Sequence, residues 1–239
     1  MARVQIQGTW PGPLTCRRGW CRAAARPWNA DVPMAHLRVE RGASGFLADC
    51  TDALLQLAGV AGVLSSPLLP GTRRPWEEAG FTLHARLALL RRELSDLAEP
   101  EHAVEDGHRR DLGEALAVDR AAFEPFWRLD LLGLQEAVEA TPHSAVHLVR
   151  RPGGGLAAFA VTGMGSSLAY LQRLAVDPAW QSRGIGRSLV RTAAAWAQRR
   201  GAAALLLNTH DGNDPAAALY ESEGFRTVTR DLAVLGRTA

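Results

Sequence analysis

One stretch of the chain, residues 168–200, restricts the fold more than any other. It begins with the apolar segment LAYLQRLAV at 168–176, which predicts a β-strand. An Asp-Pro pair then breaks the strand, a glycine-containing loop comes next, and an alanine- and arginine-rich helix begins at residue 185. The unpaired N–H groups and the dipole at such a helix N-terminus form an anion site. The stretch therefore predicts an α/β protein that binds a phosphate-bearing molecule at this loop.

Three kinds of phosphate-binding loop compete for this sequence. A nucleoside-triphosphate loop needs a lysine followed by Ser or Thr, and a dinucleotide GxGxxG loop needs a third glycine where Leu189 stands. The third kind is the acyl-coenzyme A loop, Q/R-x-x-G-x-G/A, which Gln181, Gly184 and Gly186 match. The two glycines let the backbone approach phosphates closely, and neighbouring arginines at 183 and 187 can add charge-assisted hydrogen bonds.

A second motif lies at residues 213–225, with the signature Leu219-Tyr220-x-x-x-Gly224-Phe225. With both motifs in this order, the chain resembles the GNAT superfamily of acetyl-CoA-dependent N-acetyltransferases over about residues 103–237. The resemblance implies an α/β (α+β) fold whose mixed, mostly antiparallel sheet is flanked by helices and splayed at the acetyl-CoA site.

The resemblance also implies roles for individual residues. Backbone groups of 174–176 should pair with the pantetheine arm, N–H groups of 182–187 should hold the pyrophosphate, and Asn213 should contact the arm near the thioester. Tyr220 should protonate the departing thiolate, as a phenol can. The expected cofactor-binding residues are Leu174, Ala175, Val176, Gln181, Ser182, Arg183, Gly184, Ile185, Gly186, Arg187, Ser188 and Asn213.

The general base and the acceptor site are less well marked. Many relatives place a glutamate on the strand before the loop, but residues 170–173 read YLQR here, which leaves water, His210 or Asp211 as the base. The family builds its acceptor pocket between its first two helices, where Phe126, Trp127 and Asp130 lie in this sequence. Core packing would explain the aromatic residues, Tyr220 included, equally well.

Composition excludes several chemistries. All 27 basic residues are arginine, so pyridoxal phosphate and lysine-based aldol chemistry are excluded. The formal net charge is only +2, without a dense basic stripe, so nucleic acid is a poor candidate partner. There is no apolar run long enough for a membrane span, no signal peptide and no cysteine or histidine spacing typical of a metal site. Three cysteines fit free thiols in a cytoplasmic protein.

The sequence predicts three segments. Residues 1–34, which hold five arginines, no acid before Asp31 and several prolines, read as a poorly ordered arm. Residues 35–98 echo the second half, since WEEAGF at 76–81 resembles YESEGF at 220–225. This repeat would make 35–98 a truncated, degenerate GNAT-like unit, in which Trp76 stands where the proton-donating tyrosine would be. Two such units in one chain resemble the tandem arrangement of mycothiol synthase. Residues 99–239 are then the catalytic domain.

Within these segments the pattern predicts alternating strands and helices. The expected strands are 35–41, 83–90, 145–151, 156–163, 168–176, 203–209 and 225–235, and the expected helices are 46–58, 72–79, 111–122, 126–140, 185–200 and 214–222.

Two functions fit these expectations. The first is acetyl transfer from acetyl-CoA, as cosubstrate, to a primary amine of a small molecule or a protein N-terminus by direct attack in a ternary complex. The second is a catalytically inactive CoA-binding regulatory or scaffold protein. The sequence does not identify the amine acceptor. The oligomeric state is also open, and a homodimer is one possibility.

Overall fold

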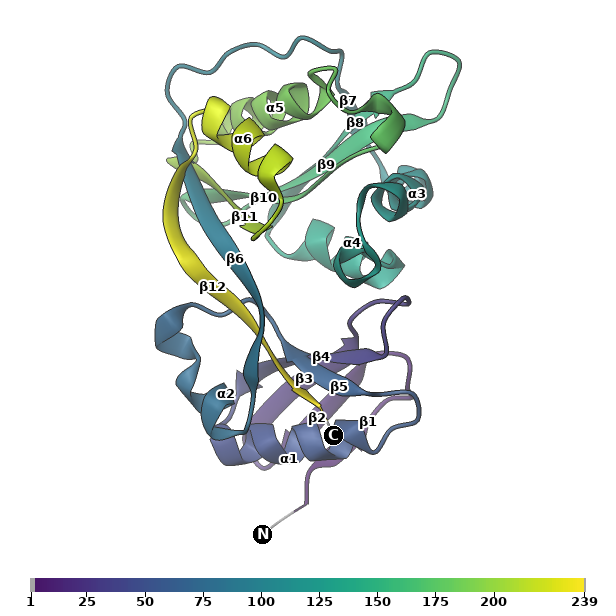
Figure 1. Cartoon of the computed structure of the whole chain (residues 1–239), viewed down its shortest axis with the longest axis vertical. Coiled ribbons are helices and arrows are strands. Elements are labelled where there is room, and N and C mark those ends of the chain that lie inside the picture. Colours follow the sequence, from purple (N-terminus) through teal and green to yellow (C-terminus); the bar gives the residue numbers. More distant parts are fainter. Residues whose placement is uncertain (1–2, 239) are drawn as a thin grey trace. The chain divides into compact units, whose positions relative to one another are not determined.

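The computed structural model describes residues 3–238 and divides the chain into two compact units (Figure 1). The first unit runs to Ala88 and also takes the C-terminal stretch from Arg230, while the second comprises Leu89–Thr229. Two long strands, β6 (Thr82–Glu93) and β12 (Arg226–Thr238), each begin in one unit and end in the other. The division therefore falls within β6, ahead of the boundary expected near residue 99, and the stretch from Arg230, expected in the catalytic domain, belongs to the first unit.

The first unit is a sheet with one long helix packed on it. Its strands follow the order β1-β2-β3-β4-β5-β12-β6. The elements that lie wholly in this unit are β1 (Gln5–Gln7), β2 (Leu14–Arg18), β3 (Cys21–Pro27), β4 (Met34–Arg41), α1 (Ser44–Leu55), β5 (Gly62–Ser65), a 3₁₀ turn (Pro70–Thr72) and α2 (Arg74–Glu78). Strands β1 to β4 pair antiparallel, and β5 lies parallel to β4.

Ordered strands from Gln5 onward therefore replace most of the arm expected at residues 1–34, whose first two residues lie outside the described range. Their inward positions alternate small and apolar residues, such as Leu14 and Cys16 on β2 and Ala23 and Ala25 on β3, all of which are buried. Outward positions carry Arg17 and Arg22, whereas Arg18 lies on the inward side and pairs with Asp49 of α1. Average composition therefore resembles disorder, while the period-two pattern encodes a sheet. The two strands are joined by Gly19, in the left-handed region, and Trp20, which is 85% exposed.

The second unit carries the strand, loop and helix of residues 168–200. Its strands follow the order β12-β6-β11-β10-β9-β8-β7. The elements that lie wholly in it are β7 (Glu105–Gly107), α3 (Leu112–Ala122), α4 (Leu131–Glu139), β8 (His143–Arg150), β9 (Leu156–Met164), β10 (Leu168–Val176), α5 (Ile185–Arg199), β11 (Ala204–His210), α6 (Asp214–Ser222) and 3₁₀ turns at Arg109–Asp111, Pro125–Trp127 and Pro178–Trp180.

Helices cover both faces of this second sheet (Figure 1). Leu112, Val118 and Leu134 of α3 and α4 pack with Phe159 and Val161 of the sheet. Helices α5 and α6 lie on the opposite face (Figure 1), and the central strand β9 is buried at every residue. A strand covered on both faces reads as a continuous apolar run, as LAAFAVTGM does.

The helix expected at 126–140 is shorter in the structure. A 3₁₀ turn covers Pro125–Trp127, and α4 begins only at Leu131. Asp130 caps this helix, since its side chain accepts a hydrogen bond from the Gly133 N–H at 2.7 Å. Because a cap residue has non-helical backbone angles, the aromatic residues lie in the turn before the helix and not on its face.

The sheet of the second unit opens between β10 and β11. Their parallel register covers only residues 168–170 against 204–206, whereas β10 continues beside β9 to Val176. A bulge between Leu171 and Arg173 bends β10 at the point of departure. The edge of β10 from 171 to 176 is thus without a strand partner on the β11 side. This opening is the splay that the family resemblance implies.

The element order of the second unit recurs in the first. In each, an antiparallel meander ends in a strand followed by a helix, a parallel strand, a short helix and a long strand. Trp76 and Phe81 form an edge-to-face pair after α2, and Tyr220 and Phe225 form a tilted pair after α6, at 4.9 and 5.6 Å. Gly80 and Gly224 precede those phenylalanines with φ of 85° and 83°. The aligned hexapeptides therefore share one local structure.

Candidate functional site

The loop between β10 and α5 has the backbone of an anion-binding turn. Ser182 and Gly184 both adopt left-handed angles, with φ of 59° and 80°, and Gly184 is the N-cap of α5. Alternation of such angles with right-handed ones turns successive N–H groups toward one side. The loop is fixed at its base, where Gln181 Nε2 donates to the Val176 carbonyl at 3.1 Å. The N-terminus of a 15-residue helix adds its dipole.

Gly186 is set by packing as well as by ligand approach. A Cβ there would lie 3.3 Å from Leu219 Cδ2 of α6 and 3.6 Å from Val176 Cγ2 of β10. The first turn of α5 therefore rests closely against both neighbouring elements. Ile185, the residue before it, is buried.

The two loop arginines differ in their surroundings. Arg183 is exposed, and its guanidinium lies 4.8 Å over the Trp180 ring. Arg187 instead pairs with the buried Glu223, Nε to Oε1, at 2.9 Å. Glu223 also accepts from the Nε and one terminal nitrogen of Arg191, each at 3.1 Å. Glu223 thus ties the start of α5 to the end of α6 and balances the charge of Arg187.

A segment before β7 completes the loop, and no motif in the sequence marks it. The backbone N–H groups of Glu101 and His102 both donate to the Ser188 hydroxyl at 3.1 Å. The His102 ring bonds the Arg183 carbonyl at 2.7 Å, and the Glu101 carboxylate pairs with Arg191 at 3.1 Å. Ser188, expected to touch the cofactor, is therefore buried and used to anchor the chain.

Tyr220 lies on α6 and is only 7% exposed. Burial raises the pKa of Tyr220 to about 12, although the nearby Arg173 charge acts in the opposite direction. The phenol therefore keeps its proton throughout the neutral range. Asn213 lies at the N-cap of the same helix, where its side chain makes no capping hydrogen bond.

Arg173 occupies the strand where relatives place a glutamate. Its Nε lies 2.6 Å from Oδ2 of Asp119, which is completely buried on α3. It also donates to the Trp127 carbonyl at 2.7 Å and lies 3.6 Å over the Phe123 ring. The second carboxylate oxygen of Asp119 accepts from the Leu129 N–H at 2.8 Å. One ion pair therefore fixes the whole turn 123–129 against β10.

That turn presents aromatic side chains toward the end of β11. Trp127 stacks on His210 with ring centroids 5.0 Å apart and planes within 8°. Phe126 packs edge-on against Trp127 at 4.7 Å. The Nδ1 of His210 lies 2.9 Å from the Asp211 carbonyl oxygen. A carbonyl only accepts, so Nδ1 is the donor in this hydrogen bond.

The structure thus brings together most of the residues expected from the sequence, in one unit. The β10 edge, the loop and the start of α5 are contiguous, with α6 and Tyr220 packed beside them. Trp127 and Phe126 join His210 at the end of β11. Asp130 is committed to the helix cap and Ser188 to the chain anchor. Asp119 and Glu223 were missed because their partners lie 54 and 32 residues away.

Two classes of feature are absent from the part of the chain that the structure describes. Among residues 3–238 there is no group of three histidine, cysteine, aspartate or glutamate residues arranged to hold a metal ion. No helix in that range is long and apolar enough to cross a membrane.

Part of the chain is similar in sequence to known proteins. A family model described as "Acetyltransferase (GNAT) family" matches residues 111–225. The [ribosomal protein bS18]-alanine N-acetyltransferase of Escherichia coli K12 is 42% identical over 76 residues, 32% of this chain and 51% of that protein. The protein of the same name from Haemophilus ducreyi is 30% identical over 110 residues, 41% of this chain and 76% of that protein. The chain spans about half the length of the first of these relatives.

A solved structure resembles nearly the whole chain. It is a tandem GNAT protein from the clavulanic acid biosynthesis pathway, with a TM-score of 0.65 and 11% identity, covering 95% of this chain and 82% of that one. At this identity the likeness concerns the fold alone.

Proposed function

Because the chain belongs to the GNAT family of acetyltransferases, we propose that it transfers an acetyl group from acetyl-CoA to a primary amine. The observation that carries the proposal is the opened edge of β10, which leads directly into the left-handed loop at the start of α5. The edge suits the amide groups of a pantetheine arm, and the loop suits a pyrophosphate. Both belong to one molecule, and they follow each other here in that order.

The residues present fit such a molecule. The backbone groups of Leu174, Ala175 and Val176 lie on the edge that lacks a β11 partner. The N–H groups from Ser182 to Gly186 surround the helix N-terminus, and Arg183 supplies an exposed positive charge. Arg187 contributes less charge than the sequence implied, because Glu223 pairs with it. We therefore assign phosphate binding chiefly to the backbone and Arg183.

The bound thioester supplies an activated acetyl group, and the chain supplies the proton transfers and the polar contacts. A backbone N–H near Ala175 or Val176, beyond the bulge of β10, stabilises the oxyanion that develops on the carbonyl. Tyr220 gives its proton to the departing thiolate sulfur. Its raised pKa keeps it protonated, and the buried position excludes competing water. Asn213, at the start of α6, orients the arm near the sulfur.

We assign the removal of the ammonium proton to His210. The Nδ1 of this ring donates to the Asp211 carbonyl, so Nε2 is the nitrogen left to take up the proton. Stacking on Trp127 fixes the ring plane. No acid occupies residues 170–173, and Arg173 in that stretch is held by Asp119.

The acceptor is a primary amine of a small molecule or of a protein N-terminus. The relatives from E. coli and H. ducreyi are alanine N-acetyltransferases of a ribosomal protein, which supports the second choice. The flat surface formed by Trp127 and Phe126 would receive an apolar or planar group next to the amine.

Thiol release from acetyl-CoA tests this proposal. The purified chain is offered free amino acids, an alanyl peptide and polyamines, and free thiol is measured against a reaction without amine. Release with at least one amine is expected. Calorimetry with CoA is run beside it, on the wild type and on Gly186→Glu, which places bulk and negative charge at the pyrophosphate.

Two results would contradict the proposal. Tight CoA binding without release for any amine would support the alternative, a CoA-binding protein that does not turn over. Unchanged CoA affinity in Gly186→Glu would show that the loop is not the pyrophosphate site.

A further inference from the structure

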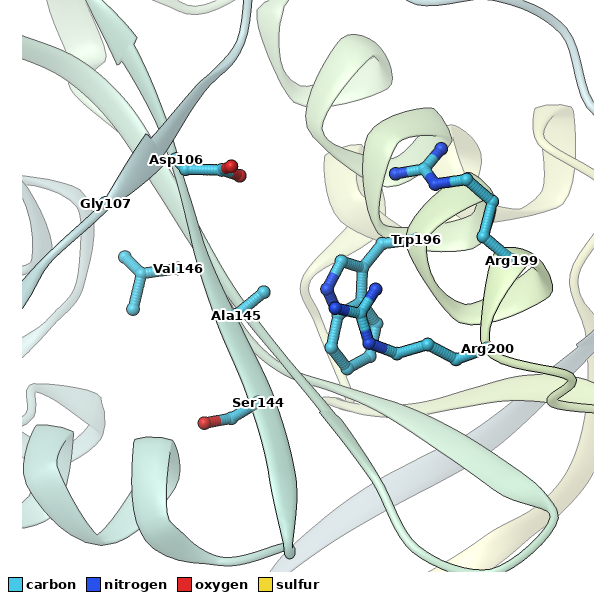
Figure 2. Close-up of a pocket in the computed structure, with 8 residues that line it drawn as sticks. All are labelled: Asp106, Gly107, Ser144, Ala145, Val146, Trp196, Arg199 and Arg200. Carbon is cyan, nitrogen blue, oxygen red and sulfur yellow. The ribbon is translucent and has the colours of Figure 1, made fainter.

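A second polar cavity lies in the second unit at the opposite end of α5 from the loop (Figure 2). It measures about 360 Å³ and is lined by Asp106, Gly107, Ser144, Ala145, Val146, Trp196, Arg199 and Arg200. Helix α5 has 15 residues, and at 1.5 Å each its two ends are roughly 20 Å apart. The cavity is therefore separate from the acetyl-transfer site, and a ligand bound in it is independent of the proposed function.

The charges around this cavity face each other without pairing. Figure 2 shows Asp106 on β7 directed toward α5, with Arg199 and Arg200 on the far side. Among residues 3–238, no ion pair involves Asp106, Arg199 or Arg200, although most other arginines of the second unit have one. The helix dipole accounts for cations at the end of α5 but not for a carboxylate opposite them.

One of the two arginines is already oriented. The Arg200 guanidinium lies 4.2 Å over the Trp196 ring, which fixes its plane and leaves its N–H groups to the side. A guanidinium held this way is suited to two parallel hydrogen bonds to a carboxylate. Arg199, at the last turn of α5, adds a second positive charge.

A buried histidine gives independent evidence of a missing partner. His147 is 1% exposed, yet neither ring nitrogen has a hydrogen-bond partner within the described chain. It pairs across the ladder with Asp106 and lies two residues from Ala145, so its side chain is on the same side of β8 as theirs. Its ring lies 6.4 Å from that of Trp196, which lines the cavity. Buried polar atoms are nearly always satisfied, so the polar surroundings of His147 are incomplete behind this wall of the cavity.

We propose that this cavity binds a small zwitterion of the α-amino acid class. Arg200 and Arg199 receive the carboxylate, and Asp106 receives the ammonium group. An anion alone would leave Asp106 unpaired, and a cation alone would leave both arginines unpaired. A zwitterion satisfies both sides at once, and the volume accommodates a small amino acid.

Isothermal titration calorimetry of the full chain tests this, with L-alanine as probe and acetate and methylamine as its two halves. L-Alanine should bind, and acetate and methylamine should each bind at least tenfold more weakly. Arg200→Ala and Asp106→Ala should each weaken L-alanine binding at least tenfold. Arg226→Ala, an exposed arginine on β12 outside this cavity, should leave it unchanged.

The outcomes that overturn the proposal are distinct. Absence of L-alanine binding refutes it, and so does acetate binding as tight as that of L-alanine, which would indicate an anion site. Binding that survives Asp106→Ala and Arg200→Ala would place the amino acid elsewhere, such as at the acceptor site. Acetyl transfer need not change in any of these variants, so failure here leaves the proposed function untouched.

Discussion

The Asp119–Arg173 pair offers the sharpest test of how the acceptor side is held. Asp119 is completely buried, and only 14% of the Arg173 side chain is exposed. Asp119→Ala would leave the guanidinium without its carboxylate in a nearly dry site and would also remove the acceptor of the Leu129 N–H. Loss of one member of a buried pair costs about 3–5 kcal/mol. We expect a value near the lower end, about 3 kcal/mol, because Arg173 keeps its contacts with Phe123 and the Trp127 carbonyl.

Urea unfolding followed by tryptophan fluorescence measures this change in the free energy of unfolding. Glu139→Ala is the matched control, since Glu139 pairs with Arg109 while 60% and 76% of the two side chains are exposed. An exposed pair contributes at most about 1 kcal/mol. The double variant Asp119→Ala/Arg173→Met should be more stable than Asp119→Ala, because it removes the stranded charge. If Asp119→Ala costs no more than Glu139→Ala, the buried pair does not hold the turn and the reasoning is wrong.

Three further variants are informative. Tyr220→Phe should lower kcat at least tenfold with little change in acetyl-CoA affinity, and an equal kcat would remove its role as acid. The wild-type rate should show no loss attributable to Tyr220 up to about pH 10, since burial raises the pKa of Tyr220 to about 12. Burial lowers the pKa of His147 from 6.5 to about 4, so the folded state should lose up to about 3 kcal/mol as pH falls from 6.5 to 4, and His147→Leu should abolish that loss in urea titrations at both pH values. Glu223→Gln should tighten CoA binding measured by calorimetry, because it leaves the positive charge of Arg187 less compensated beside the proposed pyrophosphate loop. It should also lower the melting temperature, because Arg191 loses its charged partner; an unchanged melting temperature would contradict this.

Local features of the fold could be predicted from the sequence. The strand 168–176 and the helix 214–222 have the expected bounds, and α5 ends one residue before its expected end. These elements carry strong signals nearby, namely an Asp-Pro break, left-handed glycines and a proline at the first turn of a helix. The site loop is equally local, because consecutive residues supply its N–H groups. Sequence reasoning therefore located the loop to which we assign anion binding and the helix that carries Tyr220.

The first strands were missed for an equally physical reason. The average composition of residues 1–34 is rich in arginine and proline, which indicates disorder. A sheet with one buried face needs small or apolar residues only at every second position. Alanine and cysteine at the inward positions are small, so the apolar face of β3 looks weak in the sequence although Ala23 and Ala25 are buried. A period-two count along β2 and β3 would have found the meander.

The loop, the two motifs and the likeness between residues 76–81 and 220–225 can be read from the chain because each depends on neighbours in sequence. Folding in three dimensions settles which partners meet. Glu223 takes the charge of Arg187, Asp119 holds Arg173, and β6 and β12 each complete the sheet of the unit in which they do not begin. Those pairings join residues tens of positions apart. Charges and strand edges select partners by distance in space, and one sequence read alone carries no measure of that distance.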